Sequence, residues 1–166
     1  MSSYSNICFY GGGAWGQALA ITLASLGNKS TLIVSDKIRE VDINNHISKR
    51  FPQAKLSPLI KASTDKNQII KTCDLIFITT ESKRVLDAIN QVAFLSDKNI
   101  HVVITSKGFA KSTGETFSEV VESNFPNMNL SILTGPTFAD EIANNQPAAA
   151  VIANKVIEQA NSISKL

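Results

Sequence analysis

The sequence has 166 residues, the length of one ordinary domain, and leaves no room for two substantial domains. Apolar residues make up 43% of it and charged residues 18%, below the roughly 25% of an average soluble domain, which excludes disorder by composition. A formal net charge of +2 lacks the basic excess of a nucleic-acid-binding surface, so we expect no nucleic-acid partner.

The cysteines and the apolar runs bear on the cellular compartment. Cys8 and Cys73 form no CxxC pair and have no histidines at metal-ligand spacing, so we expect reduced thiols in the core and no metal site. The first residues lack the basic and apolar regions of a signal peptide, and no run approaches the roughly 20 apolar residues that span a bilayer. The sequence predicts a cytoplasmic protein without a membrane span.

Short apolar strands alternate with amphipathic helices along the chain. A strand at 6–10 leads through three glycines into a helix, in which Trp15, Leu19, Leu23 and Leu26 share one face and which Gly27 ends. Further strands are predicted at 31–34, 59–62, 74–79, 100–105, 130–133 and 148–152. Further helices are predicted at 36–47, 65–71, 82–94, 114–123 and 136–144. A last helix is predicted to follow the final strand and to run to the end of the chain.

This alternation, without repeats or linkers, predicts an α/β fold with an open, doubly wound, mostly parallel sheet and helices on both faces. We expect residues 1–166 to form one domain. In such folds, ligands bind beyond the carboxyl ends of the strands. The loops that lead from strand to helix are therefore where binding residues are expected.

The first of these loops contains a G-x-G-x-x-G pattern. Gly11 permits the tight turn, Gly13 lets the backbone approach a pyrophosphate, and Gly16 allows close packing of helix on strand. Free N–H groups at the helix start then hold the anion. Because the pattern follows a predicted strand and opens a predicted helix, it indicates dinucleotide binding in a Rossmann-type fold, although glycine-rich turns also occur for steric reasons alone.

The same fingerprint requires an acidic residue about 20 positions further on, to bind the adenosine ribose of NAD. Asp36 stands at that distance, but it is equally suited to cap the next helix, and Ser35 is an alternative for the strand-end position. Lys37 and Arg39 follow closely, and either is placed to meet the 2′-phosphate of NADP. The choice between NAD and NADP stays open.

Two later loops carry further candidates. Lys107 directly follows a predicted strand and precedes Gly108, which favours a cation for a phosphate or carbonyl oxygen over an ordinary surface lysine. Near residue 134, a glycine and Pro136 at an expected helix start offer backbone donors, and Thr137 offers a hydroxyl.

Three segments together resemble the N-terminal domain of the bacterial NAD(P)-dependent sn-glycerol-3-phosphate dehydrogenases. They are GGGAWGQALA at 11–20, SKG at 106–108 and TGPTFADEIA at 134–143, and the resemblance covers essentially the whole chain. It implies cofactor contacts for Ala14 and Trp15 in the glycine turn, for Phe51 and for Ala139. It also implies that Lys107 contacts both cofactor and substrate, and that Gly135 and Thr137 line the substrate site.

The sequence departs from that family in three places. Ala14 stands where a serine is usual, Ser35 stands where an arginine or histidine commonly helps to bind NADP, and Thr80-Glu81-Ser82 replaces a valine-proline-serine stretch. The first two departures weaken any prediction of NADP preference.

The resemblance implies an enzyme that interconverts glycerol 3-phosphate and dihydroxyacetone phosphate for phospholipid synthesis, with a homodimer as its full-length form. The family's helical second domain, which supplies the proton-accepting lysine and the groups that grip the substrate phosphate, has no counterpart in this sequence. We therefore expect the chain to be the cofactor-binding half of such an enzyme, inactive by itself and without catalytic residues of its own. Alternatives are a stand-alone NAD(H)-binding module and a related beta-hydroxyacid dehydrogenase.

Overall fold

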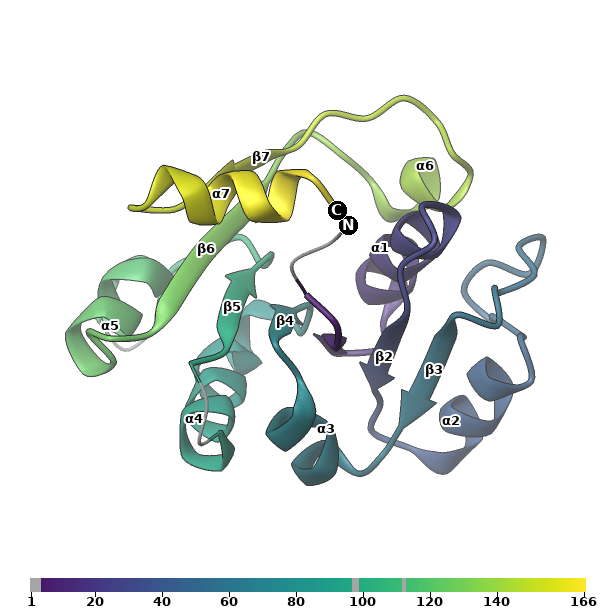
Figure 1. Cartoon of the computed structure of the whole chain (residues 1–166), viewed down its shortest axis with the longest axis horizontal. Helices are drawn as coiled ribbons and strands as arrows, with labels where there is room; N and C mark the ends of the chain where they lie inside the picture. Colours follow the sequence, from purple (N-terminus) through teal and green to yellow (C-terminus); the bar gives the residue numbers. More distant parts are fainter. Residues whose placement is uncertain (1–3, 97–98, 112) are drawn as a thin grey trace.

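The computed structural model describes residues 4–96, 99–111 and 113–166 of the chain (Figure 1). Its strands are β1 (Ile7–Tyr10), β2 (Ser30–Ile33), β3 (Ile60–Ser63), β4 (Leu75–Ile78), β5 (His101–Ile104), β6 (Asn129–Thr134) and β7 (Val151–Ala153). Its α-helices are α1 (Ala14–Ser25), α2 (Lys37–Asn44), α3 (Lys66–Thr72), α4 (Val85–Leu95), α5 (Phe117–Asn124), α6 (Ala139–Ala143) and α7 (Ile157–Ser164). A 3₁₀ turn, η1 (Ser82–Arg84), precedes α4.

Within the described residues, one sheet runs in the order β3-β2-β1-β4-β5-β6-β7. All neighbouring strands are parallel except the last pair, in which β7 runs antiparallel to β6. The strand order reverses between β1 and β4, which is the topological switch point where doubly wound sheets bind ligands. The predicted fold class is confirmed.

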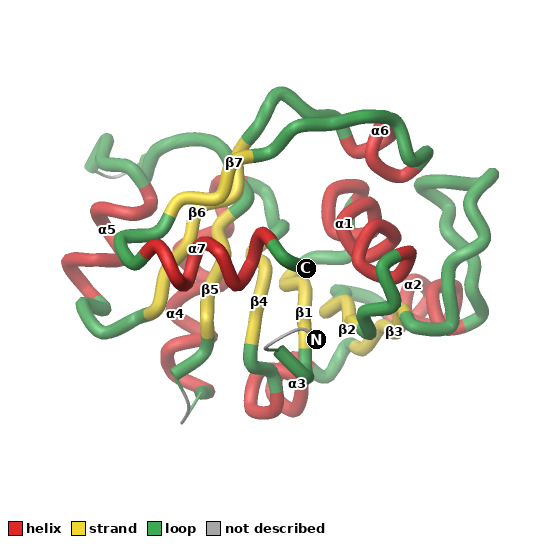
Figure 2. The backbone as a smooth tube through the Cα atoms, turned by 45° about the horizontal axis from the view of Figure 1, so that its top comes forward, coloured by secondary structure: helices red, strands yellow, loops and turns green. Residues whose placement is uncertain are grey.

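The central strands are apolar on both sides because helices cover both faces of the sheet. In β1, Cys8 and Tyr10 pack toward α3, α4 and α5, whereas Ile7 and Phe9 pack toward α1 and α7. All four residues are buried, as parallel strands require when both faces are covered. Figure 2 shows α7 lying across the strands on the face opposite α4.

Every predicted strand and helix is present, but two local predictions are wrong. Leu26, assigned to the buried face of the first helix, is 63% exposed, because α1 ends at Ser25 and Gly27 turns the chain away with a φ of +83°. The helix expected from residue 136 begins only at Ala139, so Pro136 does not occupy its first turn. The Phe138 backbone N–H is instead bonded to the Glu141 carboxylate, which caps this short helix (3.0 Å).

Other predicted boundaries shift by a few residues. The fifth α-helix starts at Phe117 and not at residue 114, because Thr116 caps it through a capping box with Glu119. The last strand covers Val151–Ala153 and not 148–152. Cys8 and Cys73 are buried free thiols, as predicted. Among the described residues, the structure has no helix that is both long and apolar enough to cross a membrane.

A buried polar network holds α7 against the sheet. The His101 ring on β5 is bonded through Nδ1 to the Tyr4 hydroxyl (2.6 Å) and through Nε2 to the Ser131 hydroxyl on β6 (2.7 Å). The Tyr4 hydroxyl also bonds to Ser162 of α7 (2.7 Å). Burial lowers the pKa of His101 to about 4, so the folded protein holds this histidine neutral.

We expect the stability of the fold to decrease as the pH falls from 6.5 toward 4. The unfolded chain protonates His101 with a pKa near 6.5, whereas the folded chain takes up that proton only near pH 4, so acid favours unfolding in this window. Denaturant unfolding at pH 7.5 and pH 4.5 should differ by on the order of 2 kcal/mol through this group. The same difference in a His101→Gln variant would show that another group is responsible.

Candidate functional site

The glycine turn joins β1 to α1 at the carboxyl edge of the sheet. Gly11 has a φ of +128°, which favours glycine, and its N–H donates to the Ile33 carbonyl on β2 (3.2 Å). Gly13 is the N-cap of α1, with no side chain bonded to the helix start and no acidic residue in the first turn. The first N–H groups of α1 and the positive end of its dipole are therefore available to an anion.

The turn packs directly against the end of β4. The Thr79 hydroxyl donates to the Gly11 carbonyl (2.8 Å), and the Thr79 N–H donates to the Tyr10 carbonyl (3.1 Å). A Cβ at Gly16 would overlap the Gly11 carbonyl oxygen and crowd the Thr79 hydroxyl. A side chain at Gly16 would therefore separate helix, turn and strand, which is the packing role predicted for it.

Gln17, a buried residue of α1, also holds the glycine turn in place. Its side-chain amide donates to the Gly12 carbonyl (2.9 Å) and accepts from the Ser48 hydroxyl (2.6 Å). Ser48 in turn accepts from the backbone N–H of Phe51 (3.0 Å). The loop that contains Phe51 is thereby tied to the glycine turn.

A cleft of about 420 Å³ lies beyond the carboxyl ends of β1, β2 and β4, where it is lined by the glycine turn and by Ser35. Three cations line it, namely Arg39, Lys66 and Arg84, against one carboxylate, Glu81. Lys83 bonds to Glu81 (2.8 Å) and holds the pKa of that carboxyl below its usual range. This nucleotide cleft therefore has the electrostatic character that an anionic ligand needs.

A second cleft, of about 320 Å³, adjoins the nucleotide cleft, since both are lined by Thr79 and Thr80. It contains Lys107, whose Nζ donates to the Gly135 carbonyl (3.1 Å). Further lining residues are Trp15, Ser82, Thr105, Ser106, Leu133, Thr134, Gly135 and Thr137. The structure therefore brings together side chains from all three sequence motifs in this lysine cleft.

The two clefts fit a dinucleotide on observations of the chain itself. A Cβ at Gly13 would meet no atom within 4 Å, so the turn leaves open space where a pyrophosphate has to approach the backbone. Trp15 lines the lysine cleft, and its indole Nε1 is buried without a hydrogen-bond partner. Glycine turn, helix start and unpaired donor are features that an extended anionic cofactor uses.

Several predicted cofactor residues lie outside the clefts. Asp36 caps α2 by accepting from the Arg39 N–H (2.8 Å), whereas Ser35, the residue before it, lines the nucleotide cleft. Phe51 is buried against Ala18 and Ala143, and Ala139 packs at the edge of the same apolar cluster. Apolar packing accounts for these side chains without a ligand, and their cofactor roles stay predictions.

Sequence reasoning missed the cations Lys66 and Arg84 and the hydroxyls Thr79 and Thr80. Each directly follows, or lies a few residues beyond, a strand end, so the rule that ligands bind at carboxyl ends would have found them. The structure gives a steric reason for glycine at position 135, because a Cβ there would overlap the carbonyl oxygen of Ala149, which precedes β7.

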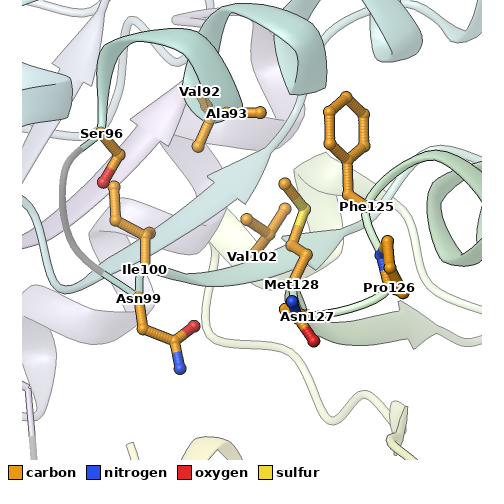
Figure 3. Close-up of a pocket in the computed structure, with 10 residues that line it drawn as sticks. All are labelled: Val92, Ala93, Ser96, Asn99, Ile100, Val102, Phe125, Pro126, Asn127 and Met128. Carbon is orange, nitrogen blue, oxygen red and sulfur yellow. The ribbon is translucent and has the colours of Figure 1, made fainter.

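A larger cavity, of about 520 Å³, lies at the amino ends of β5 and β6 (Figure 3). Its lining residues are all uncharged, and they are Val92, Ala93, Ser96, Asn99, Ile100, Val102, Phe125, Pro126, Asn127 and Met128. Lack of charge and distance from the switch point both separate it from the two clefts. Among the described residues, no group of three histidine, cysteine, aspartate or glutamate side chains could hold a metal ion.

Comparison with known proteins agrees with this geometry. A family model described as the N-terminus of NAD-dependent glycerol-3-phosphate dehydrogenase matches residues 6–160. A glycerol-3-phosphate dehydrogenase (NAD(P)+) of Brucella canis is 31% identical over 98% of this chain, which covers 49% of that relative. The corresponding protein of a Chelativorans species is 28% identical over 92% of the chain and 47% of the relative. The chain thus spans about half the length of these curated relatives.

The solved structures give the same picture of the fold. A glycerol-3-phosphate dehydrogenase from Coxiella burnetii superposes with a TM-score of 0.81 and 25% identity, over 97% of this chain and 50% of that one. A glycerol-3-phosphate dehydrogenase from Plasmodium falciparum superposes with a TM-score of 0.78 at 19% identity, over 96% of this chain and 47% of that one, which supports the fold alone.

Replacing Gly13 by valine should abolish dinucleotide binding and leave the fold intact. The residue has a φ of −75°, which any residue adopts, and its Cβ would enter open space, so the branched side chain blocks only the ligand. Calorimetric titration with NADH and NADPH measures the loss. The matched variant Gly16→Ala should instead lower the melting temperature, because its Cβ meets the Gly11 carbonyl. Normal affinity in Gly13→Val would contradict the assignment of the turn.

Replacing Arg39 by glutamine should weaken NADPH binding more than NADH binding. Arg39 lines the nucleotide cleft beside Ser35 and pairs only loosely with Asp36 (3.6 Å), so its guanidinium is placed for the extra phosphate. A lost charge-assisted hydrogen bond corresponds to roughly a 10-fold to 100-fold lower affinity. Equal losses of affinity for both cofactors would show that Arg39 does not recognise the 2′-phosphate. The control is Lys37→Gln, because Lys37 pairs with Glu40 (2.9 Å).

Proposed function

We infer that this chain binds the nicotinamide cofactor of an enzyme that interconverts sn-glycerol 3-phosphate and dihydroxyacetone phosphate. The chain belongs to the family defined by the N-terminus of NAD-dependent glycerol-3-phosphate dehydrogenase. The observation that carries this proposal is the meeting of two clefts at Thr79 and Thr80, beyond the switch point of the sheet. One cleft is basic and bounded by the glycine turn, and the other contains Lys107. This arrangement suits a long anionic cofactor that extends toward a small phosphorylated substrate.

The chain's own residues bind and orient the reactants. When bound, the nicotinamide ring supplies the hydride chemistry, and the protein determines where the ring lies. The uncapped start of α1 holds the pyrophosphate, and Arg39, Lys66 and Arg84 attract the adenosine half. These contacts direct the other half of the cofactor into the lysine cleft.

In the lysine cleft, Lys107 provides positive charge for a substrate oxygen. Its bond to the Gly135 carbonyl holds the ammonium group near Thr137, whose hydroxyl lines the same cleft. A cation fixed in this position stabilises negative charge that develops on a carbonyl oxygen during reduction. Gly135 and Thr137 line the substrate site, where the Gly135 backbone and the Thr137 hydroxyl contact the substrate.

A second part of the enzyme has to move the substrate proton. The residues that line the lysine cleft include no histidine and no carboxylate, and the interconversion of an alcohol and a ketone requires a proton acceptor. Since the chain spans about half the length of its relatives, we propose that the other half supplies this group and the grip on the substrate phosphate.

The same proposal extends to compartment and assembly. Two buried free thiols suit the reducing cytoplasm, and we place the enzyme there. For the full-length enzyme we propose a homodimer, which size-exclusion chromatography with light scattering tests directly. A dihydroxyacetone phosphate reductase activity of the full-length protein, assayed with NADH and with NADPH, tests the function. A folded full-length protein that is inactive with both cofactors would contradict it.

In the full-length enzyme, Lys107→Ala should lower kcat/KM for dihydroxyacetone phosphate by roughly 100-fold or more while the melting temperature stays unchanged. An exposed lysine contributes little to stability, so the loss falls on the reaction. Steady-state kinetics and a thermal melt measure the two effects. Lys111→Ala, an exposed lysine outside both clefts, should behave as wild type. Normal kinetics in Lys107→Ala would make Lys107 an ordinary surface residue.

A further inference from the structure

Thr80 lies at the junction of the two clefts. It follows β4 directly after Thr79 and lines both the nucleotide cleft and the lysine cleft. Any ligand that occupies both clefts has to pass this residue. Its side chain is therefore placed between the two halves of an extended cofactor.

The Thr80 hydroxyl has no hydrogen-bond partner, although its Oγ1 is fully buried. Three neighbouring hydroxyls at the same sheet edge, by contrast, have partners. Thr79 donates to the Gly11 carbonyl (2.8 Å), Thr105 donates to the Ile78 carbonyl (2.9 Å), and Ser106 donates to the Thr80 carbonyl (2.6 Å). Buried hydroxyls in folded proteins nearly always have a partner, so this exception requires an explanation.

The backbone of Thr80 is held while its side chain is not. The Ser106 bond fixes the Thr80 carbonyl, and the preceding residue is fixed to β1 through the bond from the Thr79 N–H to the Tyr10 carbonyl (3.1 Å). The hydroxyl itself makes no hydrogen bond that would hold it in place. Rotation about the Cα–Cβ bond exchanges the positions of Oγ1 and the methyl group among staggered rotamers. Such a rotation lets the hydroxyl reach a ligand at the junction without moving the chain.

The position along the cofactor decides which group meets this hydroxyl. With the pyrophosphate at the glycine turn and the adenosine half in the basic cleft, the next group toward Lys107 is the ribose that bears the nicotinamide. Ribose hydroxyls both donate and accept hydrogen bonds, as a threonine hydroxyl does. The neutral Thr80 side chain suits this sugar better than it suits a phosphate, for which the cations of the nucleotide cleft are available.

We propose that the Thr80 hydroxyl is a positioning group that hydrogen-bonds to the nicotinamide ribose and so directs the ring into the lysine cleft. This inference rests on the proposed function, because it takes the cofactor to be a nicotinamide dinucleotide that crosses both clefts. In the free protein the hydroxyl is unpaired, and binding of the cofactor provides its partner. Thr80 thus contributes to affinity for the whole cofactor and not for its adenosine half.

The test compares a whole and a half ligand in Thr80→Val, which replaces the hydroxyl by a methyl group of similar size. Calorimetric titration with NADH should give a roughly 3-fold to 10-fold weaker affinity than wild type, the value of one ordinary hydrogen bond. Titration with ADP, which lacks the nicotinamide ribose, should give an unchanged affinity. The melting temperature should stay the same or rise, because no protein partner loses its bond.

Two further variants serve as controls. Thr80→Ser keeps the hydroxyl and should keep the wild-type affinity for NADH. Thr31→Val makes the same chemical change in β2, outside both clefts, and should leave both affinities unchanged.

Three outcomes overturn the inference. Unchanged NADH affinity in Thr80→Val shows that the hydroxyl contacts no cofactor, and an equal loss for NADH and ADP shows that it acts on the site as a whole. A lower melting temperature shows that it has a structural partner. Failure of the proposed function is distinct from these, since the wild-type chain would then bind neither NADH nor ADP.

Discussion

The close contact between the glycine turn and the end of β4 is the constraint on which the rest of the site depends. Gly11, Gly16 and Thr79 meet there with no space for a further carbon atom at either glycine. This contact sets the direction in which α1 leaves the sheet and so aims its uncapped start at the switch point. The same contact brings Thr79 and Thr80 to the boundary between the nucleotide cleft and the lysine cleft.

Buried hydrogen bonds stabilise both ends of the sheet, and the candidate site lies at the carboxyl ends. At the amino ends of β5 and β6, the buried bonds of His101 tie the last helix to the first residues described. At the carboxyl ends, the Thr105 hydroxyl donates to the carbonyl of Ile78, the last residue of β4, and the Ser106 hydroxyl donates to the carbonyl of Thr80. Buried polar atoms without a hydrogen-bond partner occur in Trp15 and Thr80 at this end, and also in Ser30 and His46 elsewhere in the described residues. Those of Trp15 and Thr80 belong to residues that line the lysine cleft.

The sequence was sufficient to predict the fold because strand burial and glycine placement are local signals. Apolar runs such as 75–78 and the three-glycine turn can be recognised from the local sequence, without knowing which residues they contact in the fold. The site was predicted in part, since the motifs around Gly13, Lys107 and Thr137 converge as expected. Arg84 and Thr80 were missed because they reach the candidate site through the parallel pairing of β1 with β4, which brings together residues distant in the chain. The start of α6 was misplaced because Glu141 caps that helix from within, a preference that outweighed Pro136.

Chemical-shift mapping of the chain during a titration with NADH tests whether one nicotinamide dinucleotide spans both clefts. If it does, the backbone amide signals of Gly13, Thr80 and Lys107 shift together and saturate at the same NADH concentration. The signals of Phe125 and Met128, which line the uncharged cavity at the other end of the sheet, stay unchanged. Shifts confined to that cavity, or shifts at Gly13 without any at Lys107, would contradict binding across both clefts.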